Sequence, residues 1–272
     1  MTVDVHAVVL SNTRLSDDYS VLALAAPAIA AAAAPGQFVM VRPGTGHDPL
    51  LRRPFSVFEL LRDDAGRLTG LTLLNKRVGR GTALLYDLRP GDAVDCLGPL
   101  GRPFELAEPP GPAWMVAGGV GLAPFATLAE RLLARGVRPH LFYGARRADD
   151  LHGTGAFERL GVEITLATED GSRGDRGFVT GPLTRALGAS PARPRVYACG
   201  PTPMMRAVAD LCAAHGCRCD VSLEQKMGCG LGGCYSCVVR VRDGSGQGHF
   251  VRSCLNGPVF DASTLVWDEV GH

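Results

Sequence analysis

Four cysteines in the last quarter of the chain have the residue type and spacing of a metal-cluster site. Cys229, Cys234, Cys237 and Cys254 form the run Cys-x4-Cys-x2-Cys-x16-Cys. This run is typical of a plant-type [2Fe–2S] cluster, for which three thiolates come from one loop and the fourth comes from a later segment. A structural zinc site is the alternative, but zinc usually takes paired Cys-x2-4-Cys knuckles, whereas Cys254 stands alone. The spacing therefore favours the iron–sulfur cluster.

The loop around the first two of these cysteines is rich in glycine, with Gly228, Gly230, Gly232 and Gly233 in close succession. Without Cβ atoms, the backbone can wrap closely around a cluster and turn its N–H groups towards the sulfurs. We expect such N–H donors in this loop.

Two segments in the first third of the chain have the chemistry of a dinucleotide site. In Arg52–Ser56 (RRPFS), an arginine fork could hold a pyrophosphate, and the hydroxyl of Ser56 could reach a flavin ring nitrogen. Gly81 and Thr82 open a short helical pattern, and a helix start offers free N–H groups and a positive dipole end to phosphate. Either segment alone is weak evidence, because a solvated strand edge and an ordinary helix cap look the same. The pair at this separation is more specific than either piece.

Glycines also follow an apolar strand pattern at Gly118, Gly119 and Gly121. They suit a second pyrophosphate, although the run lacks the full Gly-x-Gly-x-x-Gly and a tight strand–helix turn explains it about as well. A later strand ends in Cys199-Gly200-Pro201, at the edge where parallel sheets bind ligands. Cys199 is either a residue that faces a nicotinamide or a small buried one.

Other reactive residue types carry no clear function. Glu224 and Lys226 precede the cysteine loop and read as a solvated charged pair. Cys212, Cys217 and Cys219 match no common metal-site spacing, and with Cys96 they are expected to be mostly small buried hydrophobic residues.

The elements that must position these motifs change character along the chain. Residues 1–103 contain short alternating segments punctuated by glycine and proline, which predict an antiparallel barrel. Residues 104–220 alternate strands with helical patterns such as 122–136 and 202–216, which predict a Rossmann-like parallel α/β sheet. Residues 221–272 form a small cysteine-bearing domain. The fold class is therefore β plus α/β, in three parts.

Composition excludes several classes of protein. The net charge of the 272 residues is +1 and no basic block stands out, which argues against a nucleic-acid partner. The longest apolar run, 23–34, is interrupted by Pro27 and too short for a bilayer, and no signal peptide is evident. Nine cysteines in such a chain fit a reducing cytoplasm.

Taken in order, RRPFS, GRGT, GGVGLAP, ACGP and SLEQKMGCGLGGCYSC with a late cysteine resemble one family. The chain resembles the electron-transfer subunit of bacterial NAD-dependent dihydroorotate dehydrogenase, within the ferredoxin-reductase superfamily. The resemblance runs over essentially the full length. Its most diagnostic part is SLE-x-x-M-x-CG-x-G-x-C-x-x-C after the nucleotide domain.

The resemblance implies three cofactors and assigns residues to them. FAD would be held by a set from the first part of the chain: Arg53, Pro54, Phe55, Ser56, Leu74, Asn75, Lys76, Gly81 and Thr82. Asn75 stands where an aromatic residue is expected in the family. The four cysteines of the run would bind the [2Fe–2S] cluster. NAD(H) is favoured over NADP(H), although Arg146 and Arg147 follow a strand where an arginine can accept a 2′-phosphate.

The resemblance also implies the reaction. Hydride leaves a nicotinamide as two electrons and a [2Fe–2S] cluster accepts one at a time, so FAD must lie between them. We find no catalytic residue for a pyrimidine substrate. In the family, dihydroorotate is oxidised at FMN on a separate catalytic subunit, and two copies of each subunit form a heterotetramer. Electrons would then reach NAD⁺ through this chain, in the pathway of pyrimidine (UMP) biosynthesis.

Two alternatives remain open. The chain could be the small subunit of another NAD(P)H-linked complex, such as a ferredoxin:NADP oxidoreductase, a sulfide dehydrogenase or a hydrogenase diaphorase. It could also be a non-enzymatic redox or metal sensor that kept the fold, although the intact RRPFS and GRGT segments argue against a sensor.

Overall fold

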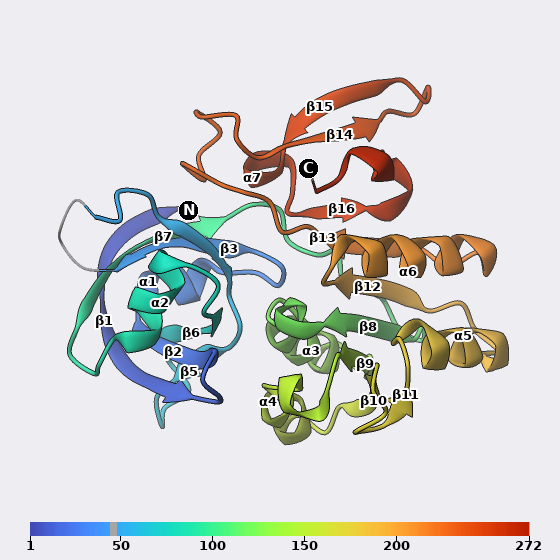
Figure 1. Ribbon diagram of the computed structural model, residues 1–272, viewed down its shortest axis with the longest axis horizontal. Helices are drawn as coiled ribbons and strands as arrows, with labels where there is room; N and C mark the ends of the chain where they lie inside the picture. Colours follow the sequence, from blue (N-terminus) through green and yellow to red (C-terminus); the bar gives the residue numbers. More distant parts are fainter. Residues whose placement is uncertain (44–47, 272) are drawn as a thin grey trace.

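The computed structural model describes residues 1–43 and 48–271, which form three units (Figure 1). An antiparallel unit comes first, a parallel α/β unit second, and a small cysteine-bearing unit last. This is the three-part architecture that the sequence predicts. Among the described residues, no helix has the length and apolar character to cross a bilayer.

The N-terminal unit is one antiparallel sheet of seven strands in the order β4-β3-β7-β1-β2-β6-β5. The chain after β4 joins its two sides, because Val57 N–H donates to the Gln37 carbonyl and Phe58 N–H donates to the Thr72 carbonyl. Buried aliphatic side chains such as Leu22, Leu71 and Val39 fill the interior. The strands are β1 (Val3–Arg14), β2 (Tyr19–Ala25), β3 (Phe38–Pro43), β4 (Arg53–Ser56), β5 (Leu60–Arg62), β6 (Leu68–Lys76) and β7 (Ala93–Leu100), with helices α1 (Pro27–Ala32) and α2 (Arg80–Asp87).

The second unit is a seven-stranded sheet in the order β11-β10-β9-β8-β12-β13-β16. Its first six strands are parallel, and β16 is antiparallel to β13. Because β8 lies between β9 and β12, the connections leave it in opposite directions, and this switch point is where such sheets bind ligands. The strands are β8 (Ala113–Gly118), β9 (Pro139–Ala145), β10 (Glu163–Thr168), β11 (Asp175–Arg176), β12 (Arg195–Cys199), β13 (Cys219–Ser222) and β16 (Val259–Asp261).

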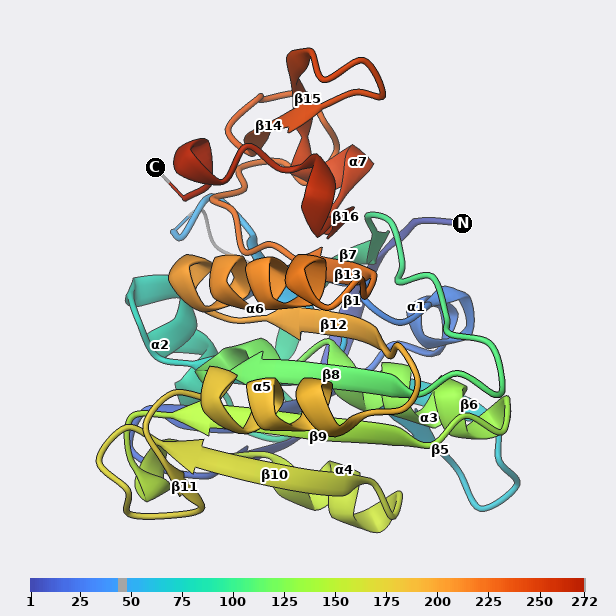
Figure 2. The same ribbon diagram turned by 90° about the vertical axis from the view of Figure 1, so that its right-hand side faces the viewer.

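Helices cover both faces of this sheet (Figure 2). On the face towards the barrel lie α3 (Phe125–Ala134) and α4 (Thr154–Arg159), and their core also contains Tyr19, Phe58 and Leu74 of the barrel. On the other face lie α5 (Thr180–Ala189) and α6 (Thr202–Ala214), whose core extends to Val239 and Val241 of the last unit.

The third unit consists of the cysteine loop, a hairpin of β14 (Val238–Arg242) and β15 (Gly248–Arg252), helix α7 (Ser253–Asn256), and β16. The chain also contains short 3₁₀ turns. Two lie in the α/β unit, at Gly119–Leu122 (η1) and Ala148–Asp150 (η2), and two come after β16, at Ala262–Thr264 (η3) and Trp267–Glu269 (η4). The predicted domain limits, 103/104 and 220/221, fall in the linker 101–112 and within β13. They stay predictions, and β13 pairs with β12 on one side and β16 on the other.

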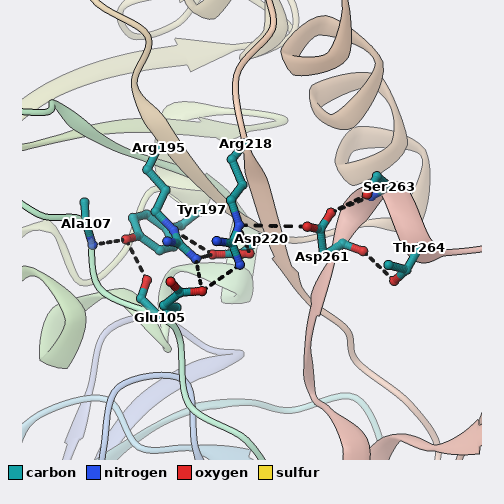
Figure 3. Close-up of polar contacts among 9 residues, drawn as sticks. All are labelled: Glu105, Ala107, Arg195, Tyr197, Arg218, Asp220, Asp261, Ser263 and Thr264. Carbon is teal, nitrogen blue, oxygen red and sulfur yellow. Dashed lines mark hydrogen bonds and ion pairs between the residues drawn. The ribbon is translucent and has the colours of Figure 1, made fainter. Parts of the chain in front are cut away.

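A polar network ties the linker to the sheet (Figure 3). Arg195 donates to Asp220 (2.9 Å) and to Glu105 (3.1 Å), and Arg218 donates to the same oxygen of Glu105 at 2.6 Å. The hydroxyl of Tyr197 donates to the Glu105 carbonyl and accepts from Ala107 N–H, at 2.9 and 2.8 Å. Arg195 holds the pKa of Glu105 down at about 2, whereas burial raises the pKa of Asp220.

The predicted alternation of strands and helices and the helix over 202–216 are confirmed, with differences among the other helices. The helix expected from Leu122 begins at Phe125, after the turn η1. Helices α1, α4 and α5 are not predicted from the sequence. In α5, Gly181 and Pro182 disrupt the helical pattern. Proline is tolerated there because it lies in the first turn, where the N–H groups have no partner inside the helix.

Candidate functional site

One cavity of about 1280 Å³ lies where the three units meet, at the carboxyl ends of β8 and β12. All the predicted cofactor residues except Asn75 and Gly81 line it, so motifs far apart in the sequence share one space. From the barrel these are Arg53, Pro54, Phe55, Ser56, Leu74, Lys76 and Thr82, and from the α/β unit Gly118, Gly119, Gly121, Cys199, Gly200 and Pro201.

The arginine pair does not act as a fork. Arg52 turns away and forms an ion pair with Asp4, with both carboxylate oxygens 2.9 Å from its Nη2. Arg53 lines the cavity, and its Nη1 donates to the carbonyls of Leu51 and Arg52. A Cβ on Gly81 would lie 3.3 Å from the Arg53 side chain, so Gly81 keeps space for that arginine. Of the two arginines, only Arg53 is positioned to meet a diphosphate.

Helix α2 begins at the cavity through a hydroxyl cap. Thr82 Oγ1 accepts from the N–H groups of Val78 and Gly79, at 2.9 and 3.0 Å. Asn75 is buried behind it and donates to the Thr82 carbonyl at 3.1 Å, while its Oδ1 has no partner among the described residues. Asn75 therefore fixes the start of α2 and does not line the cavity. The first N–H groups of the helix remain available to a phosphate.

The glycines of the nucleotide half let two chain segments touch. A Cβ on Gly121 would lie 2.3 Å from the Cys199 carbonyl oxygen, and one on Gly118 would lie 2.7 Å from the Met204 sulfur. Gly200 has φ +155°, which also suits glycine. The turn after β8 thus packs directly against the segment after β12, and together they form the floor of the crevice. Close packing is one demonstrated reason for these glycines.

Cys199 lies at this floor as a neutral thiol. Burial raises its pKa to about 12, against a smaller opposing effect of a hydrogen bond with Ser222. A thiolate is therefore not available at neutral pH, and the residue can serve only as a small polarizable surface.

Several residues that sequence reasoning left without a role also line the cavity. Glu224 and Lys226 enter it from the segment after β13, and Tyr19 enters from the barrel with its ring centroid 5.2 Å from Lys76 Nζ. Arg146, Glu169 and Phe178 also line it, and Phe178 is 71% exposed. The sequence already indicates Arg146 as an arginine that can accept a 2′-phosphate, and it lines the cavity as that role requires. The signal that could have found Glu169 is its position directly after β10, at the ligand-binding edge.

The four cysteines lie in two pairs beside the cavity. Cys229 and Cys234 form one pair, joined by hydrogen bonding. Cys237 and Cys254 form the other, in which Cys254 N–H donates to Cys237 Sγ at 3.5 Å. A hydrogen bond with Ser236 lowers the pKa of Cys234 to about 6, with a further contribution from Cys229. Burial raises the pKa of Cys254 to about 12. Cys229 is half-buried and Cys234 is exposed, whereas Cys237 and Cys254 are both buried.

The arrangement fits a two-iron cluster. The expected loop donors are in place, because Leu231 and Gly233 donate their N–H groups to Cys229 Sγ at 3.3 Å each. Four cysteine ligands, two to each iron, are what a [2Fe–2S] cluster requires, and Cys229 and Cys254 of the two pairs also interact electrostatically.

The buried pair contacts the wall of the cavity. Cys237 and Cys254 form one core cluster with Phe38, Met40, Leu97 and Leu100 of the barrel, and Met227 packs against it. Phe38 and Met227 also line the cavity. These two side chains therefore separate the cofactor cavity from the inner pair of cysteines.

Family models match two of the three units. The iron–sulfur cluster binding domain of dihydroorotate dehydrogenase B matches residues 224–266, and the oxidoreductase NAD-binding domain matches residues 115–210. The predictions of a cluster-binding unit and an NAD-binding unit are thus confirmed.

Relatives that match most of the chain carry the same family name as the cluster-binding domain. The dihydroorotate dehydrogenase B (NAD(+)) electron transfer subunit of Desulforamulus reducens is 39% identical over 243 residues, 89% of this chain and 90% of the relative. The subunit of the same name from Geobacillus thermodenitrificans is 36% identical over 260 residues, 95% of this chain and 96% of the relative.

Solved structures share the fold. An NADH-dependent reduced ferredoxin-NADP oxidoreductase, described for flavin-based electron bifurcation, matches with a TM-score of 0.84 and 29% identity over 98% of this chain and 91% of that chain. Phthalate dioxygenase reductase matches in fold with a TM-score of 0.59, at 20% identity over 92% of this chain and 77% of that chain.

These findings confirm the predicted oxidoreductase class and the cofactor set of FAD, a [2Fe–2S] cluster and NAD(H). The chain belongs to the family of electron transfer subunits of NAD-dependent dihydroorotate dehydrogenase B.

Proposed function

We propose that this chain carries electrons along one line, from a catalytic partner to the cluster cysteines, then to the flavin end of the cavity, and finally to NAD⁺. The observation that carries this order is the position of Phe38 and Met227, which line the cavity and pack with the inner cysteine pair. In the outer pair, Cys234 is exposed and Cys229 is half-buried. The four thiols thus extend from the cavity wall to the surface.

The residues of the chain bind and orient. Arg53 and the start of α2 would hold the FAD diphosphate, and Pro54, Phe55 and Ser56 would lie along the flavin ring. The glycine turn after β8 and the Cys199–Pro201 segment would hold the nicotinamide nucleotide against it. When bound, the flavin exchanges an electron pair with the nicotinamide and single electrons with the cluster. The packed floor and buried Tyr19 keep water away from the place where the two rings would meet.

The partner we propose is an FMN-containing catalytic subunit that oxidises dihydroorotate, in a heterotetramer of two copies of each chain in the cytoplasm. Three apolar side chains around the outer cysteines support its docking there: Leu231, Tyr235 and Leu255, which are 58%, 61% and 43% exposed. We call these three residues the cluster face. The Arg252 guanidinium joins them, because it stacks on Tyr235 at 4.8 Å and donates to the Gly232 carbonyl at 2.8 Å. Exposed apolar groups beside a redox centre are suited to a protein contact.

The test is to coexpress the chain with its candidate FMN subunit, purify the complex, and measure dihydroorotate-dependent reduction of NAD⁺. FAD and iron content are measured on the same sample. We expect activity that needs both chains. Cys234→Ser should abolish it together with the iron, while NADH-dependent reduction of ferricyanide through FAD persists. Cys217→Ser, a partly exposed cysteine outside the run, serves as the control and should keep both activities.

Docking is tested separately with Leu231→Asp, which places a charge on the cluster face. Copurification with the partner should fall while FAD, iron and ferricyanide reduction are unchanged. Leu10→Asp, at an exposed apolar site on β1, should leave the complex intact. Equal loss of the complex in both variants would refute the assigned surface.

A second candidate is the small subunit of an NADH-dependent ferredoxin-NADP oxidoreductase, favoured by the structural match over 98% of this chain. Copurification from the native host distinguishes the two. An FMN subunit supports the first function, and a larger iron–sulfur subunit supports the second.

A further inference from the structure

A second cavity, of about 990 Å³, lies at the opposite edge of the parallel sheet, where β8 and β12 begin. The linker, the end of α3 and the segment 193–195 line it, and it is open to solvent. Its volume is within the range of roughly 300–1,000 Å³ that small-molecule sites occupy. Among the described residues that line it, none belongs to the predicted cofactor or cluster set, so the electron-transfer function does not account for it.

The wall of this cavity carries an excess of positive charge. Three of its arginines have carboxylate partners: Arg135 lies 2.5 Å from Glu108, and Arg195 and Arg218 share Glu105 and Asp220. Asp261 is another partner of Arg218, with its Oδ2 3.8 Å from the Arg218 Nε. The lining arginines are Arg131, Arg135, Arg193, Arg195 and Arg218, against the lining carboxylates Glu105 and Glu108.

The two other lining arginines, Arg131 and Arg193, have no carboxylate partner among the described residues. Neither has a hydrogen bond or ion pair to another side chain within residues 1–43 and 48–271. Arg131 lies in the last turn of α3, where the helix dipole favours a cation, so its place has a local explanation. Arg193 has none of this kind, and its guanidinium lies against the backbone at Gly216. Two unpaired guanidinium groups on one cavity wall lower the energy of a bound anion, and arginine suits phosphate in particular.

The remainder of the wall is apolar. Pro35, Phe104 and Leu106 line it, next to Ala107 and Pro194. We propose that this cavity binds a small phosphorylated compound, whose phosphate charge is held by Arg131 and Arg193 and whose organic part lies on this apolar wall. The site adjoins Glu105 in the linker, so its ligand contacts the segment that connects the barrel to the α/β unit.

The test uses the protein loaded with FAD and cluster, with NAD⁺ in excess so that the cofactor cavity is filled. Inorganic pyrophosphate is titrated in by calorimetry at low ionic strength. We expect one binding event per chain that weakens as salt is added, because the contact is ionic. The double variant Arg131→Gln/Arg193→Gln should bind at least about 10-fold more weakly.

A charge-matched control is Arg89→Gln/Arg138→Gln, which removes two exposed arginines that do not line the cavity. It should bind pyrophosphate like the unchanged protein. Absence of binding to the unchanged protein, or equal weakening in both double variants, overturns the proposal. Arg193→Lys keeps the positive charge at this exposed position. If it binds pyrophosphate like the unchanged protein, replacement of Arg193 does not itself disturb the fold of the site. Unchanged FAD and iron content in every variant separates this result from a failure of the electron-transfer function.

Discussion

Gly121 lies at the point where two backbones touch in the floor of the cofactor cavity. A Cβ there would lie 2.3 Å from the Cys199 carbonyl oxygen, and the other nearest atoms, Cys199 C and Gly200 N, are also backbone atoms that cannot move aside like a side chain. We predict that Gly121→Ala lowers the free energy of unfolding by about 1–3 kcal/mol, because the turn after β8 must move away from the end of β12. It should also raise KM for NADH. Denaturant unfolding and steady-state reduction of ferricyanide measure the two effects.

Gly188→Ala is the matched control, because a Cβ in this helical position of α5 meets no atom within 4 Å. It should leave KM unchanged and raise stability slightly, by up to about 1 kcal/mol. Equal losses in the two variants would contradict the packing argument.

Glu169 gives a second prediction at the residue scale, on the choice of nucleotide. It lines the cavity together with Arg146, directly after β10 and β9, and we assign the adenosine to this carboxylate and guanidinium because ligands bind at this edge of the sheet. A carboxylate repels the 2′-phosphate of NADPH. We predict that Glu169→Gln raises kcat/KM for NADPH by about 10-fold and changes that for NADH less.

The neighbouring carboxylate supplies the control. Asp170 does not line the cavity and instead accepts from Ser172 N–H at 2.9 Å. Asp170→Asn should keep the ratio of the two kcat/KM values. The interpretation fails if both variants shift the ratio alike.

At the scale of elements, strand β9 contains a histidine whose titration should affect stability. Burial lowers the pKa of His140, against a smaller opposing effect of Glu163. Its ring stacks on Phe142 at 4.2 Å, and its Nε2 lies 2.8 Å from the Thr165 hydroxyl. The folded protein thus favours neutral His140, and the unfolded chain binds more protons as the pH falls below about 6.5. Stability should therefore rise with pH in this window and be lost as the pH falls through it.

The measurement is the urea midpoint between pH 5 and pH 7.5. His140→Gln should flatten the dependence on pH, whereas His249→Gln, at an exposed position on β15, should not. An unchanged slope in His140→Gln would show that other groups cause it.

The elements also show which parts of the fold can be predicted from the sequence. Alternation and glycine–proline punctuation predict the barrel strands, and the cysteine run predicts the cluster loop, because these depend on residues close together in the chain. Helix α5 escapes prediction because its glycine and proline disrupt the pattern. The ion pair of Arg52 with Asp4 escapes because it joins residues 48 positions apart, and only the folded chain reveals that one arginine of the fork is already used.

At the scale of the whole molecule, Tyr197 joins the linker to the α/β sheet. Its hydroxyl makes two backbone hydrogen bonds there, with the Glu105 carbonyl and Ala107 N–H. Tyr197→Phe leaves the buried Ala107 N–H without its acceptor, which costs about 1–3 kcal/mol of unfolding free energy. We also expect faster proteolytic cleavage within residues 101–112.

Tyr86→Phe removes one hydrogen bond, to the Ser16 carbonyl at 2.7 Å, between α2 and the turn after β1 in the N-terminal unit. It should destabilise less and leave the cleavage of the linker unchanged. Faster cleavage of the linker in Tyr86→Phe as well would argue against a specific role for Tyr197.

The pairing of β16 with β13 has a consequence for recombination of such proteins. The cysteine-bearing unit contributes the last strand of the neighbouring sheet, through the partners Asp220–Asp261, Val221–Phe260 and Ser222–Val259. A chimera that exchanges residues 221–272 for those of another reductase would therefore replace an edge strand and cut β13 within its ladder. Successful exchange requires that the joint lie before Cys219 and that the incoming segment match the surface of β12. Genes that shuffle this unit are expected to carry the two strands together.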